Sequence, residues 1–136
     1  MKQGIQTNYP EQVLKAEGCY FFCLMRWAEV IRGKEFISSR EINFLFDLSK
    51  QLEYCKKDAT ILFPHSILNL AIPDKKFTQI ERTVTPPAGL GQYILFMTKP
   101  NYNHFLFYNN GQTWDPLDPE RPAAKDYKVE SYRVIR

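Results

Sequence analysis

The 136-residue sequence has few of the features that mark a specialised class of protein. No apolar run approaches the ~18 residues that a transmembrane helix needs, and the start MKQGIQTNYPEQ has no apolar segment of the signal-peptide kind. The chain also shows no internal repeat and no low-complexity segment. We therefore expect one globular domain over residues 1–136, in the cytoplasm and without a membrane partner.

Cysteine and histidine are scarce. The three cysteines, Cys19, Cys23 and Cys55, are too few and odd in number for a disulfide framework, which fits a reducing compartment. His65 and His104 are the only histidines, and their distance from the cysteines matches no zinc-ligand spacing. The sequence therefore implies no metal and no other cofactor.

Neither positive nor negative charge is present in large excess. The 18 basic and 15 acidic residues give a net charge of +3 and are interspersed along the chain. A nucleic-acid-binding domain usually carries a basic stripe, so nucleic acid is an unexpected partner here. Apolar residues make up 44% and aromatic residues 15% of the chain, which favours a packed core over disorder.

The first half of the chain has helical periodicity. An apolar pattern runs over 13–31 and is interrupted at Gly18, which predicts a turn followed by a long buried helix over 19–33. A second helix is capped by a serine at 38–39, and Pro64 begins a short third helix.

The second half of the chain has the sequence pattern of β-strands. The predicted strands are 77–85, 92–98, 104–108, 112–115 and 127–135, and a proline-rich loop is expected at 116–124. Helices followed by strands indicate the α+β class.

The stretch NHFLFYNNGQTWDPL predicts a hairpin that brings His104 and Asp115 together. With a turn at 109–110, His104 lies directly opposite Asp115. With a turn at 110–111, the register shifts by two and Asp115 becomes the diagonal neighbour of His104. Both registers put the two side chains on the same face of the sheet, because strand side chains alternate with period two.

The other face of this hairpin is apolar. Phe105, Phe107 and Trp114 are expected to pack into the core, with Trp114 opposite Phe105 in the first register. A histidine beside a carboxylate has its tautomer fixed and its charged form stabilised, which is half of a nucleophilic triad. The alternative is a half-exposed surface pair that contributes little to stability.

Cys19 is the candidate nucleophile. It follows Gly18 at the start of the long helix, where the helix N-terminus favours a thiolate and is expected to lower the thiol pKa. Cys23 lies one turn further along and is expected to be an inert core thiol. The alternative is that Cys19 is likewise a small buried apolar residue.

Cysteine at a helix start, histidine on a strand and Asp-Pro on the next strand together resemble the papain-like cysteine peptidase superfamily. GCYFF looks like the nucleophile motif of that superfamily. NHFLFYNNGQTWDPL is similar to the histidine strand and the Trp-Asn/Asp-Pro strand of staphopain-like enzymes and bacteriocin-leader peptidases. The resemblance covers the N-terminal helix and the C-terminal sheet, with little match between Gly33 and Leu90.

The resemblance implies a papain-like α+β fold, with N-terminal helices packed on a small antiparallel sheet. It assigns Cys19 as nucleophile, His104 as general base and Asp115 as the residue that orients the histidine. The superfamily also places a glutamine a few residues before the cysteine to hold the oxyanion. Gln12 is the nearest candidate, one position further upstream than usual, and Gln6 is the second choice.

The implied function is hydrolysis of a peptide or amide bond, with the peptides of bacterial cell walls as one substrate class. Trp114 and Tyr102 are candidate substrate contacts. Two alternatives remain open at this point. One is a non-catalytic papain-like module that binds a partner protein, and the other is a small phage-type protein that binds nucleic acid or inhibits a partner. The oligomeric state is left open.

Overall fold

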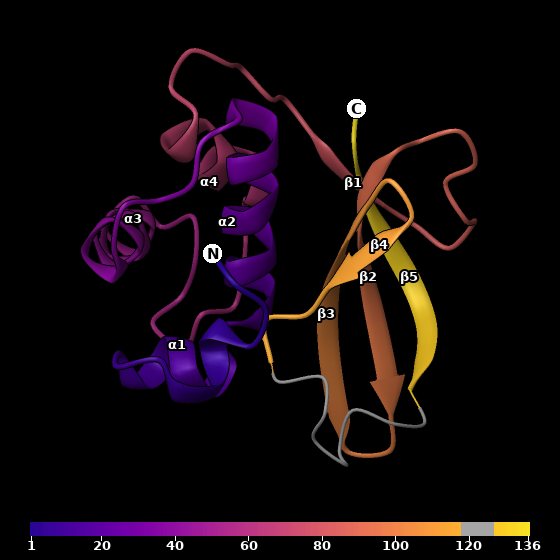
Figure 1. Ribbon diagram of the computed structural model, residues 1–136, viewed down its shortest axis with the longest axis horizontal. Coiled ribbons are helices and arrows are strands. Elements are labelled where there is room, and N and C mark those ends of the chain that lie inside the picture. Colours follow the sequence, from indigo (N-terminus) through magenta and orange to yellow (C-terminus); the bar gives the residue numbers. More distant parts are fainter. Residues whose placement is uncertain (118–126) are drawn as a thin grey trace.

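The computed structural model describes residues 1–117 and 127–136. In these residues the first half of the chain forms helices and the second half forms a five-stranded antiparallel sheet. Figure 1 shows the helices gathered on one face of the sheet. The predicted α+β class is confirmed, whereas the loop expected at 116–124 lies mainly outside the described residues.

The helical layer consists of five elements. They are η1 (Ile5–Asn8), α1 (Gln12–Glu17), α2 (Cys19–Arg32), α3 (Ser39–Gln51) and α4 (Pro64–Ala71). Glu11 caps α1 by accepting a hydrogen bond from the Leu14 N–H at 2.7 Å, and Pro64 begins α4 as predicted. No helix in the described part of the chain has the length and apolar character needed to cross a membrane.

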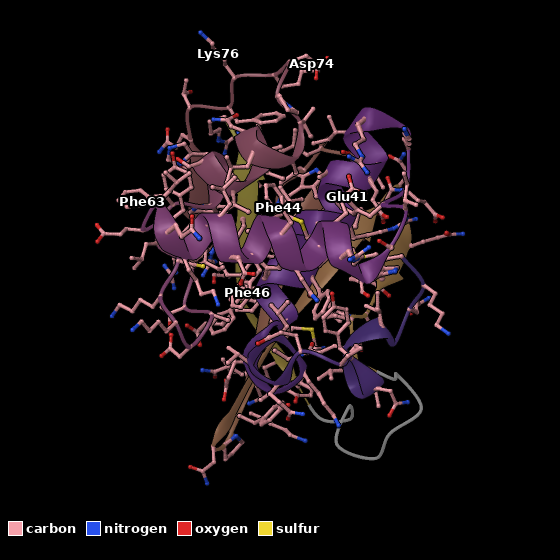
Figure 2. The ribbon with its side chains drawn as sticks, turned by 90° about the vertical axis from the view of Figure 1, so that its left-hand side faces the viewer. Glu41, Phe44, Phe46, Phe63, Asp74 and Lys76 are labelled. Atoms are coloured by element: carbon pink, nitrogen blue, oxygen red, sulfur yellow. The ribbon has the colours of Figure 1, made fainter. Side chains whose placement is uncertain are left out.

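Helix α2 is the centre of the molecule. It packs against β3 on one side and against α4 on the other, which explains why its sequence is apolar around most of its circumference. Trp27 of α2 reaches the sheet, where its ring centroid lies 5.8 Å from that of Phe107. Helix α3 lies on the side of the helical layer that faces away from the sheet (Figure 2), and its Phe44 is exposed.

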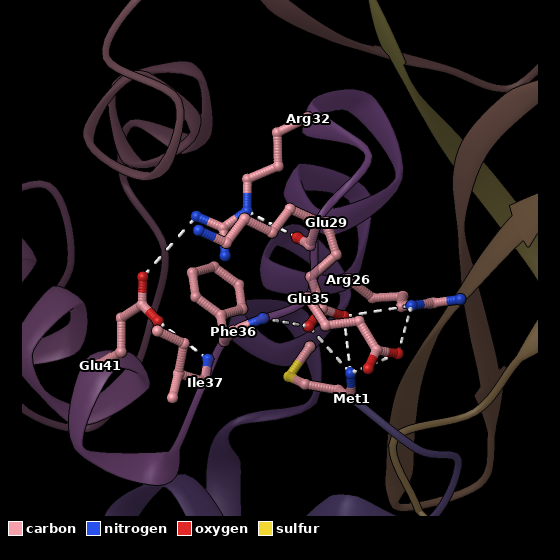
Figure 3. Close-up of polar contacts among 9 residues, drawn as sticks. Met1, Arg26, Glu29, Arg32, Glu35, Phe36, Ile37 and Glu41 are labelled. Atoms are coloured by element: carbon pink, nitrogen blue, oxygen red, sulfur yellow. Dashed lines mark hydrogen bonds and ion pairs between the residues drawn. The ribbon is translucent and has the colours of Figure 1, made fainter.

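A buried carboxylate fixes the C-terminal part of α2 (Figure 3). The two oxygens of Glu29 accept hydrogen bonds from the Met1 ammonium at 2.9 and 2.8 Å. Arg26 lies 3.2 Å from one oxygen, and the Phe36 N–H donates to the other at 2.8 Å. Glu29 therefore ties the first residue of the chain and the segment after α2 to the middle of the fold.

The sheet has the strand order β1-β5-β2-β3-β4. Its strands are β1 (Ile80–Thr83), β2 (Gln92–Lys99), β3 (Tyr102–Asn109), β4 (Gln112–Trp114) and β5 (Lys128–Ile135). The last strand in the chain, β5, is inserted between β1 and β2. Consequently the sheet is complete only when β5 has joined it.

The β3–β4 hairpin follows the second of the two predicted registers. Asn109 pairs with Gln112, and the two-residue turn at 110–111 has positive φ at both positions, 48° and 91°. A tight hairpin turn requires this conformation, and Asn-Gly adopts it at low cost. Trp114 consequently pairs with Phe107, so the expectation that Trp114 opposes Phe105 is wrong.

Candidate active site

The hairpin brings His104 and Asp115 into direct contact. The Nε2 atom of His104 lies 2.7 Å from Oδ1 of Asp115, and both residues are buried. The same Oδ1 accepts a hydrogen bond from the Leu117 N–H at 2.9 Å, which fixes the carboxylate. The other ring nitrogen of His104, Nδ1, is buried and has no hydrogen-bond partner among the described residues. This imidazole is thus held at Nε2, while the hydrogen-bonding capacity of Nδ1 is unused.

The N-terminal segment also packs against the site, by pairing with the residues that follow β4. The Gly4 N–H donates to the Asp115 carbonyl at 2.9 Å, and the Gln6 N–H donates to the Pro116 carbonyl at 2.8 Å. The side chain of Gln6 is buried, and its Nε2 donates to the Lys15 carbonyl at 3.1 Å. Its Oε1 has no partner in the described part of the structure.

Cys19 is the first residue of α2 and is half-buried. Burial raises the pKa of its thiol to about 11, while the N–H groups of Phe105 and Tyr20 lower the pKa by a smaller amount. Phe105 follows His104 directly on β3, so the sulfur lies beside the strand position that carries the histidine. The expected depression of the Cys19 pKa is wrong, because desolvation outweighs the effect of the helix N-terminus.

Cys23 behaves as expected for an inert thiol. It is fully buried, and its pKa is raised well above the usual value by desolvation. Cys55 is also buried and lies outside this part of the molecule. Among the cysteines, Cys19 is therefore the one with access to solvent.

A cleft of about 450 Å³ opens beside Cys19. Gln6 and Glu17 line it together with the cysteine, and so do Lys99 at the end of β2 and Tyr102 at the start of β3. Cys19 thus faces a polar cleft large enough for a few peptide atoms on each side of a scissile bond.

A larger cavity of about 1120 Å³ lies elsewhere, at the end of α3. Lys50, Tyr54 and Phe63 are among its lining residues, and its one cysteine, Cys55, is nearly inaccessible. Neither histidine lines it. We take the smaller cleft as the candidate site, because it holds the accessible thiol of Cys19, which accepts a hydrogen bond from the backbone of Phe105, the residue next to His104 on β3. His104 and Asp115 themselves are not among the residues that line this cleft.

Comparison with known proteins gives one match. The family model described as "Protein of unknown function, DUF261" matches residues 3–136, which is nearly the whole chain. The chain belongs to the DUF261 family. No curated protein and no solved structure gave a significant match.

Two residues that the sequence suggested for this DUF261 site are not brought into the cleft. Gln12 is exposed at the start of α1 and does not line it. Its place is taken by Gln6, which the pairing of the N-terminal segment with Pro116 carries inward. Trp114 is buried against Phe107 and does not line the cleft either, whereas Tyr102 does.

Sequence reasoning missed Glu17 in the same DUF261 cleft. The signal was present, since an acidic residue two positions before a candidate nucleophile is electrostatically unfavourable for a thiolate. The preference for Gln12 over Gln6 came from counting positions along the chain. That count cannot detect that η1 folds back toward the cleft.

Proposed function

We propose that this DUF261 protein hydrolyses a peptide or amide bond in the manner of a papain-like enzyme. Cys19 acts as the nucleophile, His104 as general base and then general acid, and Asp115 orients the imidazole. The observation that carries the proposal is the 2.7 Å contact between His104 and Asp115, with the second ring nitrogen left open. Cys19 lies at the helix start beside the same strand.

The raised pKa of Cys19, about 11, means that the thiol is protonated at neutral pH before substrate binds. His104 therefore removes the thiol proton as the sulfur attacks the carbonyl carbon, and Asp115 stabilises the imidazolium. The imidazolium then returns the proton to the leaving amine, which departs and leaves a thioester on Cys19. Water deprotonated by His104 hydrolyses the thioester, which releases the acid and regenerates the thiol.

The oxyanion of the tetrahedral intermediate needs hydrogen-bond donors. The backbone N–H of Cys19 at the start of α2 is one, and we assign the second to the Nε2 group of Gln6 in place of Gln12. Gln6 lines the cleft. One of its two amide hydrogens goes to the Lys15 carbonyl, so the other is available to the oxyanion.

The second candidate function is a non-catalytic module of the same fold that binds a partner protein. The observation that favours it is the raised pKa of Cys19, because a hydrolase of this type needs its thiol deprotonated during the reaction. In that case the cleft binds a peptide and does not cleave it.

A paired hydrolysis and binding assay separates the two functions. Wild type, Cys19→Ala and Cys55→Ala proteins are incubated with a mixed peptide library and with muropeptides, and products are identified by mass spectrometry. We expect cleavage by wild type and Cys55→Ala, with a loss of about a thousandfold or more in Cys19→Ala. Cleavage that persists in Cys19→Ala rules out the nucleophile, and peptide binding by wild type without any cleavage supports the non-catalytic module.

A further inference from the structure

We propose that Glu17 selects the substrate, by binding a positively charged group of the peptide directly beside the bond that Cys19 attacks. This inference rests on the proposed function and assigns a substrate class to the same cleft. That class is peptides with a lysine, arginine, other diamino acid or free amino group next to the scissile bond.

The positions of Glu17 and Cys19 are fixed relative to each other by the junction of two helices. Glu17 is the last residue of α1 and Cys19 the first of α2, and Gly18 alone joins them. A Cβ atom at Gly18 would lie 2.5 Å from the Leu14 carbonyl oxygen in the last turn of α1, so only glycine fits at this junction without displacing the backbone. The carboxylate and the thiol therefore belong to one rigid corner of the cleft.

The carboxylate of Glu17 has no ion-pair partner among the described residues. It is exposed and lines the cleft, and it contributes to raising the pKa of Cys19. In the free protein this charge opposes formation of the thiolate. A substrate cation that pairs with Glu17 removes that opposition, so the correct substrate itself makes Cys19 easier to deprotonate.

Charged thiol reagents test the field at Cys19 without relying on catalysis. The probes are 2-aminoethyl methanethiosulfonate, which is a cation, and 2-sulfonatoethyl methanethiosulfonate, which is an anion. Labelling of Cys19 is followed by peptide mass spectrometry at low ionic strength, and the cation-to-anion rate ratio is divided by that of free cysteine. Low salt is used because screening weakens interactions at exposed charges.

We expect Glu17→Gln to lower this ratio about threefold to fivefold, the size of an interaction with an exposed charge. Glu17→Lys should lower the ratio further. Glu53→Gln is the matched control, since it removes the same charge from a residue that lines the other cavity, and it should leave the ratio unchanged. An unchanged ratio in Glu17→Gln overturns the proposal, and so does a Cys19 that neither reagent reaches.

The peptide library gives the second measurement. Wild type should cleave peptides with lysine or arginine beside the bond faster than the matched glutamine peptides, and Glu17→Gln should remove this preference. Cleavage without charge preference contradicts the role of Glu17 but leaves the proposed function standing. A charge-selective thiol with no cleavage of any peptide contradicts the proposed function but supports the role of Glu17.

Discussion

The buried polar groups near the two ends of α2 differ in whether they have hydrogen-bond partners. Near the C-terminal end, both oxygens of Glu29 are paired with an ammonium, a guanidinium and a backbone N–H. At the N-terminal end, Nδ1 of His104 and Oε1 of Gln6 are buried and unpartnered among the described residues. Glu29 of α2 is thus satisfied, whereas His104 of β3 and Gln6 of η1 are only partly so.

An unpaired buried polar atom costs about 1–3 kcal/mol, so the unpartnered atoms of His104 and Gln6 lower the stability of the fold. Gln6 lines the cleft beside Cys19, so under the proposed function a substrate can supply a partner there. In the Glu29 cluster, in contrast, both carboxylate oxygens already accept hydrogen bonds.

The largest expected effect is a loss of stability, and it comes from removing the Glu29 carboxylate near the C-terminal end of α2. Glu29→Ala should lower the free energy of unfolding by roughly 3–5 kcal/mol, because it leaves the partners of a buried carboxylate uncompensated. Urea denaturation followed by circular dichroism measures this loss. Glu35→Ala is the control, since the Glu35 side chain is 71% exposed, and it should cost less than about 0.5 kcal/mol. A Glu29→Ala protein as stable as wild type would show that the cluster does not hold the helix.

A smaller loss of stability is expected from the Cys19 thiol, at the N-terminal end of α2, when the pH is raised. The pKa of Cys19 rises from 9.0 to about 11 on folding, with burial as the main cause. The buried neutral thiol therefore contributes stability that is complete below pH 9.0 and is lost as the pH rises through about 11. Two pKa units correspond to roughly 2–3 kcal/mol.

Cys19→Ala isolates this contribution. The difference in unfolding free energy between wild type and Cys19→Ala should shrink as the pH is raised from about 8 to about 11 under reducing conditions. Chemical denaturation at each pH provides the measurement. Parallel curves for the two proteins over this range would mean that the thiol is not desolvated in the native state.

The smallest effect is expected at Asp115. In Asp115→Asn the amide oxygen can still accept hydrogen bonds from His104 and from the Leu117 N–H, so tautomer and orientation are kept while the negative charge is lost. We expect a folded protein with a sharply reduced rate of hydrolysis, because the carboxylate also stabilises the charged imidazole, but with a smaller loss than in Cys19→Ala. Steady-state kinetics on a cleaved library peptide tests this. A loss as large as that of Cys19→Ala would mean that charge, and not orientation, is the main contribution of Asp115.

Local signals made part of this structure predictable from the sequence. The break at Gly18 and the end at Gly33 bound α2, and an Asn-Gly turn in alternating strands brings His104 and Asp115 together. In each case the decisive residues lie within about fifteen positions of one another, so periodicity and turn chemistry detect them.

Other features depend on contacts between distant segments. The insertion of β5 between β1 and β2 and the inward position of Gln6 both follow from pairing of segments far apart in the chain. The raised pKa of Cys19 has a similar origin, because the burial that causes it comes from the folded surroundings of the helix start. The catalytic roles of Cys19, His104 and Asp115 stay a prediction until hydrolysis is measured.

The pairing of the N-terminal segment with the residues after β4 has a consequence for biosynthesis. Gln3 and Asp115, 112 positions apart, are joined by a hydrogen bond of 3.4 Å between the Asp115 N–H and the Gln3 side chain. Closing so long a loop is entropically costly and slows folding. A growing chain on the ribosome holds Cys19 early but lacks its histidine and carboxylate until the hairpin has emerged. The cleft therefore matures only after the residues up to Asp115 have been synthesised.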